Sequence, residues 1–421
     1  MRRALAALAI ALAACDGAAP LDAGRAPDAG AADAGDDGGL GARDGGVPPG
    51  PIEAFPDRCV EGQAPDAACW RARRDPSSAS IALASAIAER WMARHAATRL
   101  GWDWVDAVLV FALTELARVS EDPALLDYAA DWLGVHVEAG YDIAWSDHCP
   151  PMLSAIPLFA ERGELRWLRI VEDVLGYYVD APRTAEGGVG HLGRFGRVSP
   201  RQWLDSLMMV AVPLARWGEL ANDPAWIGEA STQATIFADT MQDEASGWLV
   251  HAYPLESDQT PGTFWARGNG WVLFAMFELL RIHRVRGEAP PAALVRAAER
   301  LSAAVIAAQD PATGRFWTVL NRPGETYLET SATALFATGL ARGYRYGWLG
   351  EDARDAAIAA LAGVVGAIRD EGEGPIVGDI SGPTTVGTYE YYAGVPRADD
   401  LPYGLGAVLL ALLEVSGLDA L

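Results

Sequence analysis

Hydrophobic residues recur at three- and four-residue spacing along most of the chain from about Ser77 onward. This spacing follows one face of an α-helix, which completes a turn about every 3.6 residues. We therefore predict twelve helices between this point and the C-terminus. They span residues 81–97, 105–119, 123–138, 151–162, 164–180, 201–220, 224–242, 268–286, 291–308, 330–346, 351–369 and 402–416.

The breaks between these helices also repeat. Four of them combine an acidic residue, a glycine and an apolar or aromatic piece that we expect to be strand-like, with the glycines at Gly187, Gly247, Gly314 and Gly374. Spacings of 60, 67 and 60 residues indicate a repeating unit of two helices and a crossing loop. Six such hairpins predict an all-α fold, an (α/α)6 barrel, although an open helical solenoid would show the same period.

In such a barrel the inner helices all point the same way, so their first turns meet at one mouth. Polar and aromatic residues gather at six of the predicted helix starts, which indicates a ligand site at that mouth. These groups are Trp102–Trp104, Asp147–His148, Gln202–Asp205, Trp265–Asn269, Glu329–Ser331 and Asp400–Tyr403. The positive ends of the helix dipoles would favour an anionic ligand there.

The N-terminus follows a different pattern. Two arginines precede an apolar run, residues 4–14, which fits the core of a secretion signal and is too short to span a bilayer. The run ends in the letters LAAC, which resemble a bacterial lipobox; an ordinary cleaved signal with a chance cysteine is the alternative. Residues 1–14 would then be a signal peptide and Cys15 a lipidated residue. This predicts a location in the bacterial cell envelope, with the lipid anchor as the membrane contact.

Residues 16–50 consist almost wholly of Asp, Ala, Gly and Pro without apolar periodicity, so we expect a disordered tether. The tether and a short segment with Cys59 and Cys69 occupy residues 15–76, and the folded domain occupies residues 77–421. In an exported protein these two cysteines would form a disulfide that closes a small loop. We expect Cys149 to be a lone thiol before a helix rather than a catalytic one.

The amino-acid composition excludes several classes of function. The chain has 33 arginines and no lysine against 56 acidic residues, a net charge of −23. Missing lysine excludes Schiff-base and P-loop lysine chemistry, and the acidic balance argues against a nucleic-acid partner. Fifteen tryptophans favour a carbohydrate ligand, because indole faces stack on sugar rings, although most would be core residues. Six scattered histidines show no metal-ligand spacing, so we expect no metal and no cofactor.

The stretch Phe264–Trp271 resembles the signature of the unsaturated uronyl hydrolases, glycoside hydrolase families 88 and 105. Other blocks agree with these families in order and spacing from about Ile81 to the C-terminus. They are Ser146–His148, Arg183–His191, Gln202–Met209, Gly247–His251, Glu329–Ala334 and Tyr391–Gly406. The resemblance implies an (α/α)6 barrel that acts on lyase-derived oligosaccharides with a 4,5-unsaturated uronic acid at the non-reducing end. Such enzymes hydrate the double bond: a carboxyl protonates C4, water adds at C5, and the resulting hemiketal falls apart.

The resemblance places the group that is first acid and then base on Asp205. We expect burial between Trp203 and an apolar run to raise the pKa of Asp205. Asp147 would be the second carboxyl, which orients the substrate or keeps Asp205 protonated; either aspartate could instead be a helix cap. The candidates for substrate binding are His191, His251, Trp265, Arg267 and Trp271. One of the two tryptophans would stack on sugar and the other would lie in the core.

The chain departs from the family at one place. A lysine often follows the histidine that precedes the helix of the catalytic aspartate, whereas Leu192 follows His191 here and Arg194 and Arg197 lie nearby. An arginine would then have to bind the uronate, with Arg267 as the first candidate. Two other functions stay open: a different (α/α)6 sugar enzyme, either an epimerase or an inverting glycosidase, or a surface lipoprotein that binds glycans without turnover. The oligomeric state is not fixed by the sequence.

Overall fold

Thirteen α-helices make up most of the chain that the computed structural model describes, which is Arg74 and residues 77–418. Twelve correspond to the predicted helices, and the thirteenth is the short α14 (Tyr389–Gly394). Within these described residues, no helix is both long and apolar enough to cross a membrane. The predicted signal peptide, lipidated Cys15, tether and Cys59–Cys69 disulfide lie outside them.

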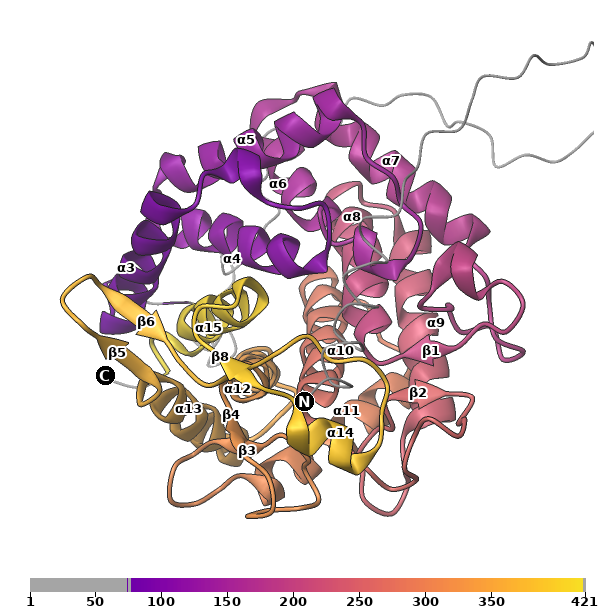
Figure 1. Cartoon of the computed structure of the whole chain (residues 1–421). Helices are drawn as coiled ribbons and strands as arrows, with labels where there is room; N and C mark the ends of the chain where they lie inside the picture. The colour runs from indigo at the N-terminus through magenta and orange to yellow at the C-terminus, as the bar shows by residue number, and fades with distance from the viewer. Residues whose placement is uncertain (1–73, 75–76, 419–421) are drawn as a thin grey trace, which may run out of the picture. The chain divides into compact units, whose positions relative to one another are not determined.

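Six helices form an inner ring and are buried around most of their circumference. They are α4 (Trp104–Ser120), α6 (Met152–Arg162), α8 (Val212–Leu220), α10 (Ala266–Arg286), α12 (Thr330–Arg345) and α15 (Pro402–Val415). Each packs against the next in chain order, and α15 packs against α4, so the ring closes (Figure 1). This closure confirms the predicted (α/α)6 barrel and excludes the open solenoid.

Six further helices form an outer ring. They are α3 (Ala79–Arg94), α5 (Pro123–Ala139), α7 (Leu165–Asp180), α9 (Pro224–Met241), α11 (Ala292–Ala308) and α13 (Glu351–Val365). Buried and exposed positions alternate along them with helical period, because one face covers the inner ring and the other meets water. The predicted start of α5 is confirmed: Asp122 caps the helix by accepting a hydrogen bond from the Ala124 N–H, directly before Pro123.

The four repeating glycine turns follow the same circular order as the helices, because each one packs against a neighbouring outer helix. Gly187, Gly247, Gly314 and Gly374 all have positive φ, between 70° and 92°. The first three turns lie against the next outer helices, α9, α11 and α13, and the fourth lies against Arg90 of α3. A Cβ on Gly314 would come within 2.1 Å of the carbonyl oxygen of Ala359, so this position also requires glycine for its packing.

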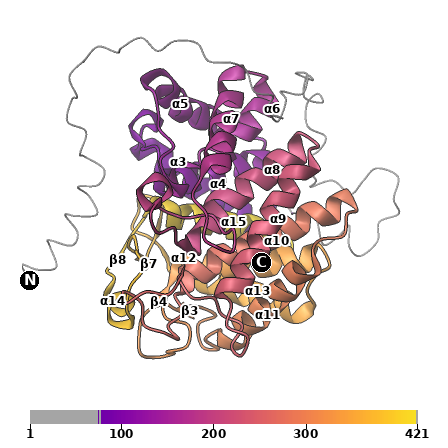
Figure 2. The ribbon, with the colours of Figure 1, turned by 90° about the vertical axis from the view of Figure 1, so that its right-hand side faces the viewer.

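Short strand pairs and α14 gather at the N-terminal ends of the inner helices, as the side view in Figure 2 shows for β3, β4, β7, β8 and α14. The pairs are β1 (Gln202–Trp203) with β2 (Ala252–Tyr253), β3 (Phe316–Trp317) with β4 (Leu328–Glu329), β5 (Ile368–Asp370) with β6 (Pro375–Val377), and β7 (Ile380–Ser381) with β8 (Arg397–Ala398). Two predicted helix bounds were therefore wrong. Residues 202–203 form β1 because they pair with β2, and residues 368–369 belong to β5 because they pair with β6.

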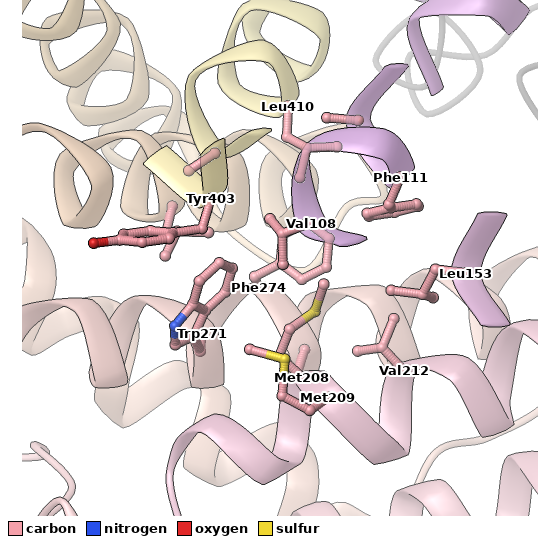
Figure 3. Packing of buried hydrophobic residues seen from close by; sticks show 14 of the residues in the cluster. Val108, Phe111, Leu153, Met208, Met209, Val212, Trp271, Phe274, Tyr403 and Leu410 are labelled. Atoms are coloured by element: carbon pink, nitrogen blue, oxygen red, sulfur yellow. The ribbon is translucent and has the colours of Figure 1, made fainter. Parts of the chain in front are cut away.

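The barrel interior is filled along its length. Next to the mouth lies an apolar layer of side chains from most of the inner helices, including Phe111, Leu153, Met208, Phe274 and Leu410 (Figure 3). Nearer the C-terminal ends of the inner helices lies a set of buried charges that we call the ionic cluster. It comprises Glu115, Glu219, Glu278, Glu414, Arg216, Arg281 and Arg342. The apolar layer separates the ionic cluster from the mouth.

Candidate active site

Asp205 and His251 are brought together by the pairing of β1 with β2. Asp205 begins a helical stretch that runs through a π-helical turn, Leu207–Ala211, into α8. His251 directly precedes β2, and the Leu204 N–H donates to its carbonyl oxygen at 3.0 Å. As a result, Nε2 of His251 lies 3.3 Å from Oδ2 of Asp205. Both residues are buried, with 1% of His251 and 9% of Asp205 exposed.

The segment that carries His251 is held by Asn269 in the first turns of α10. The Asn269 Oδ1 accepts from the Leu249 N–H, and its Nδ2 donates to the carbonyl oxygens of Leu249 and Trp265. Asn269 is fully buried, so these bonds are shielded from water. The sequence placed Asn269 in the signature stretch without assigning it a role.

Asp147 and His191 form a second carboxyl–imidazole pair. Asp147 lies in the short 3-10 turn before α6, and its Oδ2 is 3.7 Å from Nε2 of His191. The ring is oriented from its other side, where Nδ1 lies 2.9 Å from the Ser206 hydroxyl. The Ser146 N–H donates to the carbonyl oxygen of His191 at 3.0 Å. Two inner-helix starts thus each present a buried carboxyl beside a histidine.

The two carboxyls differ in proton affinity. Burial, together with the nearby carboxylates of Asp205 and Asp103, raises the pKa of Asp147 well above its ordinary value. Burial also acts on Asp205, but the hydrogen bond and attraction of His251, followed by His191 and Arg267, lower its pKa. The expectation that burial would raise the pKa of Asp205 was therefore wrong, because it overlooked His251. Of the two carboxyls, Asp147 therefore has the higher proton affinity.

Aromatic rings enclose both histidines. Trp203 stacks on His191 with centroids 4.3 Å apart and meets His251 edge-on at 5.7 Å. Burial lowers the pKa of His191 to about 4, so this imidazole is neutral at neutral pH. Trp203 keeps some exposed surface, and its Nε1–H has no hydrogen-bond partner among the described residues.

The remaining predicted binding residues lie deeper than expected. Trp265 is 1% exposed and stacks on His251 at 4.4 Å. Trp271 is fully buried in the apolar layer, where a sugar ring could not reach its face without rearrangement. Arg267 is 1% exposed, and its two Nη atoms donate to the carbonyl oxygens of Ser381 and Gly382 and to the Thr384 hydroxyl. The guanidinium thus anchors a loop instead of projecting into the mouth.

The residues near the missing family lysine have other surroundings. Arg194 forms an ion pair with Asp142. Arg194 and Arg197 line a cleft of about 410 Å³ together with Tyr141, Tyr177 and Asp180. Cys149 is a buried free thiol, and burial raises its pKa, which disfavours the nucleophilic thiolate. In the described part of the chain, no three His, Cys, Asp or Glu side chains form a group that could hold a metal ion.

Comparisons with known proteins agree with the barrel fold. The family model of glycosyl hydrolase family 88 matches residues 83–418. A curated Agrobacterium fabrum protein is 30% identical over 223 residues, which is 47% of this chain and 94% of that protein. An unsaturated 3S-rhamnoglycuronyl hydrolase of an Alteromonas species is 24% identical over 51% of this chain and half of its own length. A solved Klebsiella pneumoniae structure, a possible member of glycoside hydrolase family 105, is 27% identical with a TM-score of 0.68, covering 75% of this chain and 82% of its own.

Proposed function

The chain belongs to glycoside hydrolase family 88, and we propose that it releases a 4,5-unsaturated uronic acid from the non-reducing end of lyase-derived oligosaccharides. The observation that carries this proposal is the pair Asp147 and Asp205, two buried carboxyls with opposite pKa shifts at the mouth of the barrel. Hydration of a vinyl ether needs an acid for C4 and a base for the water that adds at C5. A carboxyl pair that holds one proton can supply both functions.

We assign the proton transfers to Asp205. The pKa of Asp147 is raised mainly by burial, so its carboxyl is a weak acid that keeps its proton. Burial acts on Asp205 as well, but the neighbouring groups, above all His251, outweigh it and lower the pKa of Asp205. A uronate carboxylate bound nearby adds negative charge, which raises the pKa of Asp205 and lets it carry a proton. Asp205 then protonates C4, takes a proton from water, and returns to its starting state.

Neutral Asp147 has a second use in this scheme. Its proton allows an anionic sugar to approach without repulsion, and its O–H can donate a hydrogen bond to the substrate. Arg267 would contribute positive potential to Asp205 from beneath the loop, without touching the sugar.

The experiment is an ultraviolet absorbance assay on a panel of lyase digests, some from pectin and some from glycosaminoglycans. The conjugated C4=C5 bond absorbs, and its hydration removes the band. We expect the band to disappear with at least one digest in the presence of the protein and to persist with Asp205→Asn. A band that persists on every digest, or full activity in Asp205→Asn, would refute the proposed function.

We further propose that Cys15 carries a lipid that anchors the protein in the bacterial cell envelope. The support is the charged start, the short apolar run and the LAAC box of the sequence. Detergent phase partitioning of membranes from producing cells tests it. The full chain should enter the detergent phase, and Cys15→Ser should move it to the aqueous phase; equal partitioning of both would contradict a lipid at Cys15.

A further inference from the structure

Tyr392 lies behind His251, on the side away from Asp205. Its phenolic oxygen is 2.8 Å from Nδ1 of His251, whereas Nε2 of the same ring faces Asp205 at 3.3 Å. Tyr392 is 2% exposed and belongs to α14, the helix that the sequence did not predict. One buried imidazole thus joins the phenol to the carboxyl that we assign to proton transfer.

The direction of these hydrogen bonds follows from the backbone. The Gly387 N–H donates to the Tyr392 oxygen at 3.0 Å, and an N–H can only donate. This leaves the phenolic hydrogen free to point at Nδ1 of His251, which then accepts. A neutral imidazole that accepts at Nδ1 carries its proton on Nε2, and Nε2–H faces the ionised Asp205. Every donor in the series meets an acceptor only in this arrangement.

The loop that carries Tyr392 is fixed at its base by three inner-helix starts. Arg267 of α10 donates to the carbonyl oxygens of Ser381 and Gly382, and the Tyr403 hydroxyl of α15 donates to that of Ser381 at 2.6 Å. The Ser381 N–H donates in turn to Glu329, the N-cap of α12. Gly387 admits no side chain, because a Cβ would come within 2.2 Å of the Tyr391 ring. The loop therefore has little freedom to move its phenol.

We propose that Tyr392 is a positioning residue that holds His251 in the tautomer with the proton on Nε2, directed at Asp205. The proposal rests on the proposed function for its catalytic consequence only. Without the phenol, the lone pair of Nε2 can turn toward Asp205 in a share of molecules, and those molecules lose the hydrogen bond that sets the proton affinity of Asp205. Tyr392 itself touches neither substrate nor reacting atoms in this scheme.

The test is nitrogen-15 NMR of ring-labelled histidine, with His251→Gln to assign the signal. Wild type should show His251 protonated on Nε2, and Tyr392→Phe should show a mixture of tautomers. The kcat of Tyr392→Phe should fall about tenfold with little change in KM, since one buried hydrogen bond is lost. Tyr391→Phe is the matched control: it removes a hydroxyl from the same helix that bonds Thr385 and not His251, and both readouts should match wild type.

A wild-type His251 protonated on Nδ1 would overturn the proposal without any variant. So would a Tyr392→Phe protein with the wild-type tautomer, or kcat losses that are equal in the two phenylalanine variants. The tautomer is read in the absence of substrate. A failure of the proposed function, which would appear as inactive wild type, is therefore distinguishable from a failure of this inference.

Discussion

Both ends of the barrel contain buried carboxyl groups, but the pKa of Glu278 at one end is lowered and the pKa of Asp147 at the other is raised. In the ionic cluster, Glu278 is fully buried and accepts hydrogen bonds from Arg216, Arg281 and Arg342 at 2.6–2.8 Å. At the mouth, Asp147 is almost as buried, and its histidine stands 3.7 Å away. Burial opposes ionisation at both ends, but the arginines overcome it and hold the pKa of Glu278 well below its usual range.

The comparison shows that burial alone does not decide what a carboxyl does. A carboxyl surrounded by guanidinium groups stays ionised and holds the inner helices together. Asp147, which has no arginine beside it, has a raised pKa instead. The apolar layer between the two ends keeps the arginines away from the aspartates. Breaking each end separately should therefore damage a different property of the protein.

The largest effect should come from removing the carboxylate of Asp205. Asp205→Asn keeps the shape of the side chain but cannot transfer a proton, so we expect kcat to fall about 1,000-fold. Asp147→Asn should lower kcat less, about tenfold, because Asp147 only donates a hydrogen bond to the substrate and asparagine keeps a neutral donor at that place. Steady-state kinetics on a lyase digest measure both, and a reversed order would exchange the two roles.

At the opposite end, Glu278→Gln should cost stability and spare catalysis. The substitution leaves three arginines around an uncharged amide, and loss of one partner from a buried ionic network destabilises by about 3–5 kcal/mol. Denaturant unfolding measures this loss. Glu373→Gln, which removes an exposed ion pair with Arg94, is the matched control and should leave the unfolding midpoint unchanged. A Glu278→Gln protein as stable as this control would mean that the ionic cluster does not stabilise the fold.

At the mouth, by contrast, Asp147→Asn should stabilise the folded protein. Because the folded pKa of Asp147 lies above its unfolded value of 3.8, the carboxyl favours the fold at low pH, and this contribution is lost as pH rises through the folded pKa. Asparagine stays neutral at every pH. We expect the variant to melt above wild type at pH 7 and the difference to vanish near pH 4. An unchanged difference across that range would contradict the raised pKa.

The smallest effect should be on the pH dependence of stability through His191. Its folded pKa of about 4 lies below the unfolded value of 6.5, so the stability it contributes is complete above pH 6.5 and is lost as pH falls toward 4. His191→Gln cannot take up that proton. Its melting temperature should fall less steeply than that of wild type between pH 6.5 and 4, and parallel curves would show that His191 does not titrate in this window.

Sequence periodicity predicted the barrel well because its helices are long and its turns repeat. It missed α14 and strands such as β1, since a two-residue strand exists only through its partner, here β2; of the strand-like pieces it expected, two are β3 and β6. It grouped Asp147 and Asp205 at one mouth through their places at helix starts, and only the family resemblance added His251. It could not predict the proton distribution, which depends on the 3.3 Å approach of two residues 46 positions apart.

The ionic cluster was missed for a related reason. Its arginines and glutamates lie in inner helices, where a charged residue at helical spacing usually indicates a solvated face. Only the closed ring makes that face internal and brings Arg216 within reach of both Glu115 and Glu278. Likewise, Arg267 was expected to bind substrate because its anchoring partners, Ser381 and Gly382, lie more than a hundred residues away.

The most direct test of the account follows one digestion with two detectors, one for the ultraviolet band of the C4=C5 bond and one for the released oligosaccharide. Hydration destroys the double bond before the glycosidic bond breaks. We therefore predict that the band is lost at least as fast as oligosaccharide appears, with one double bond consumed for each chain released. With Asp205→Asn, the band should persist and no oligosaccharide should be released. Release of oligosaccharide with the band intact would mean attack at the anomeric carbon and would contradict the account.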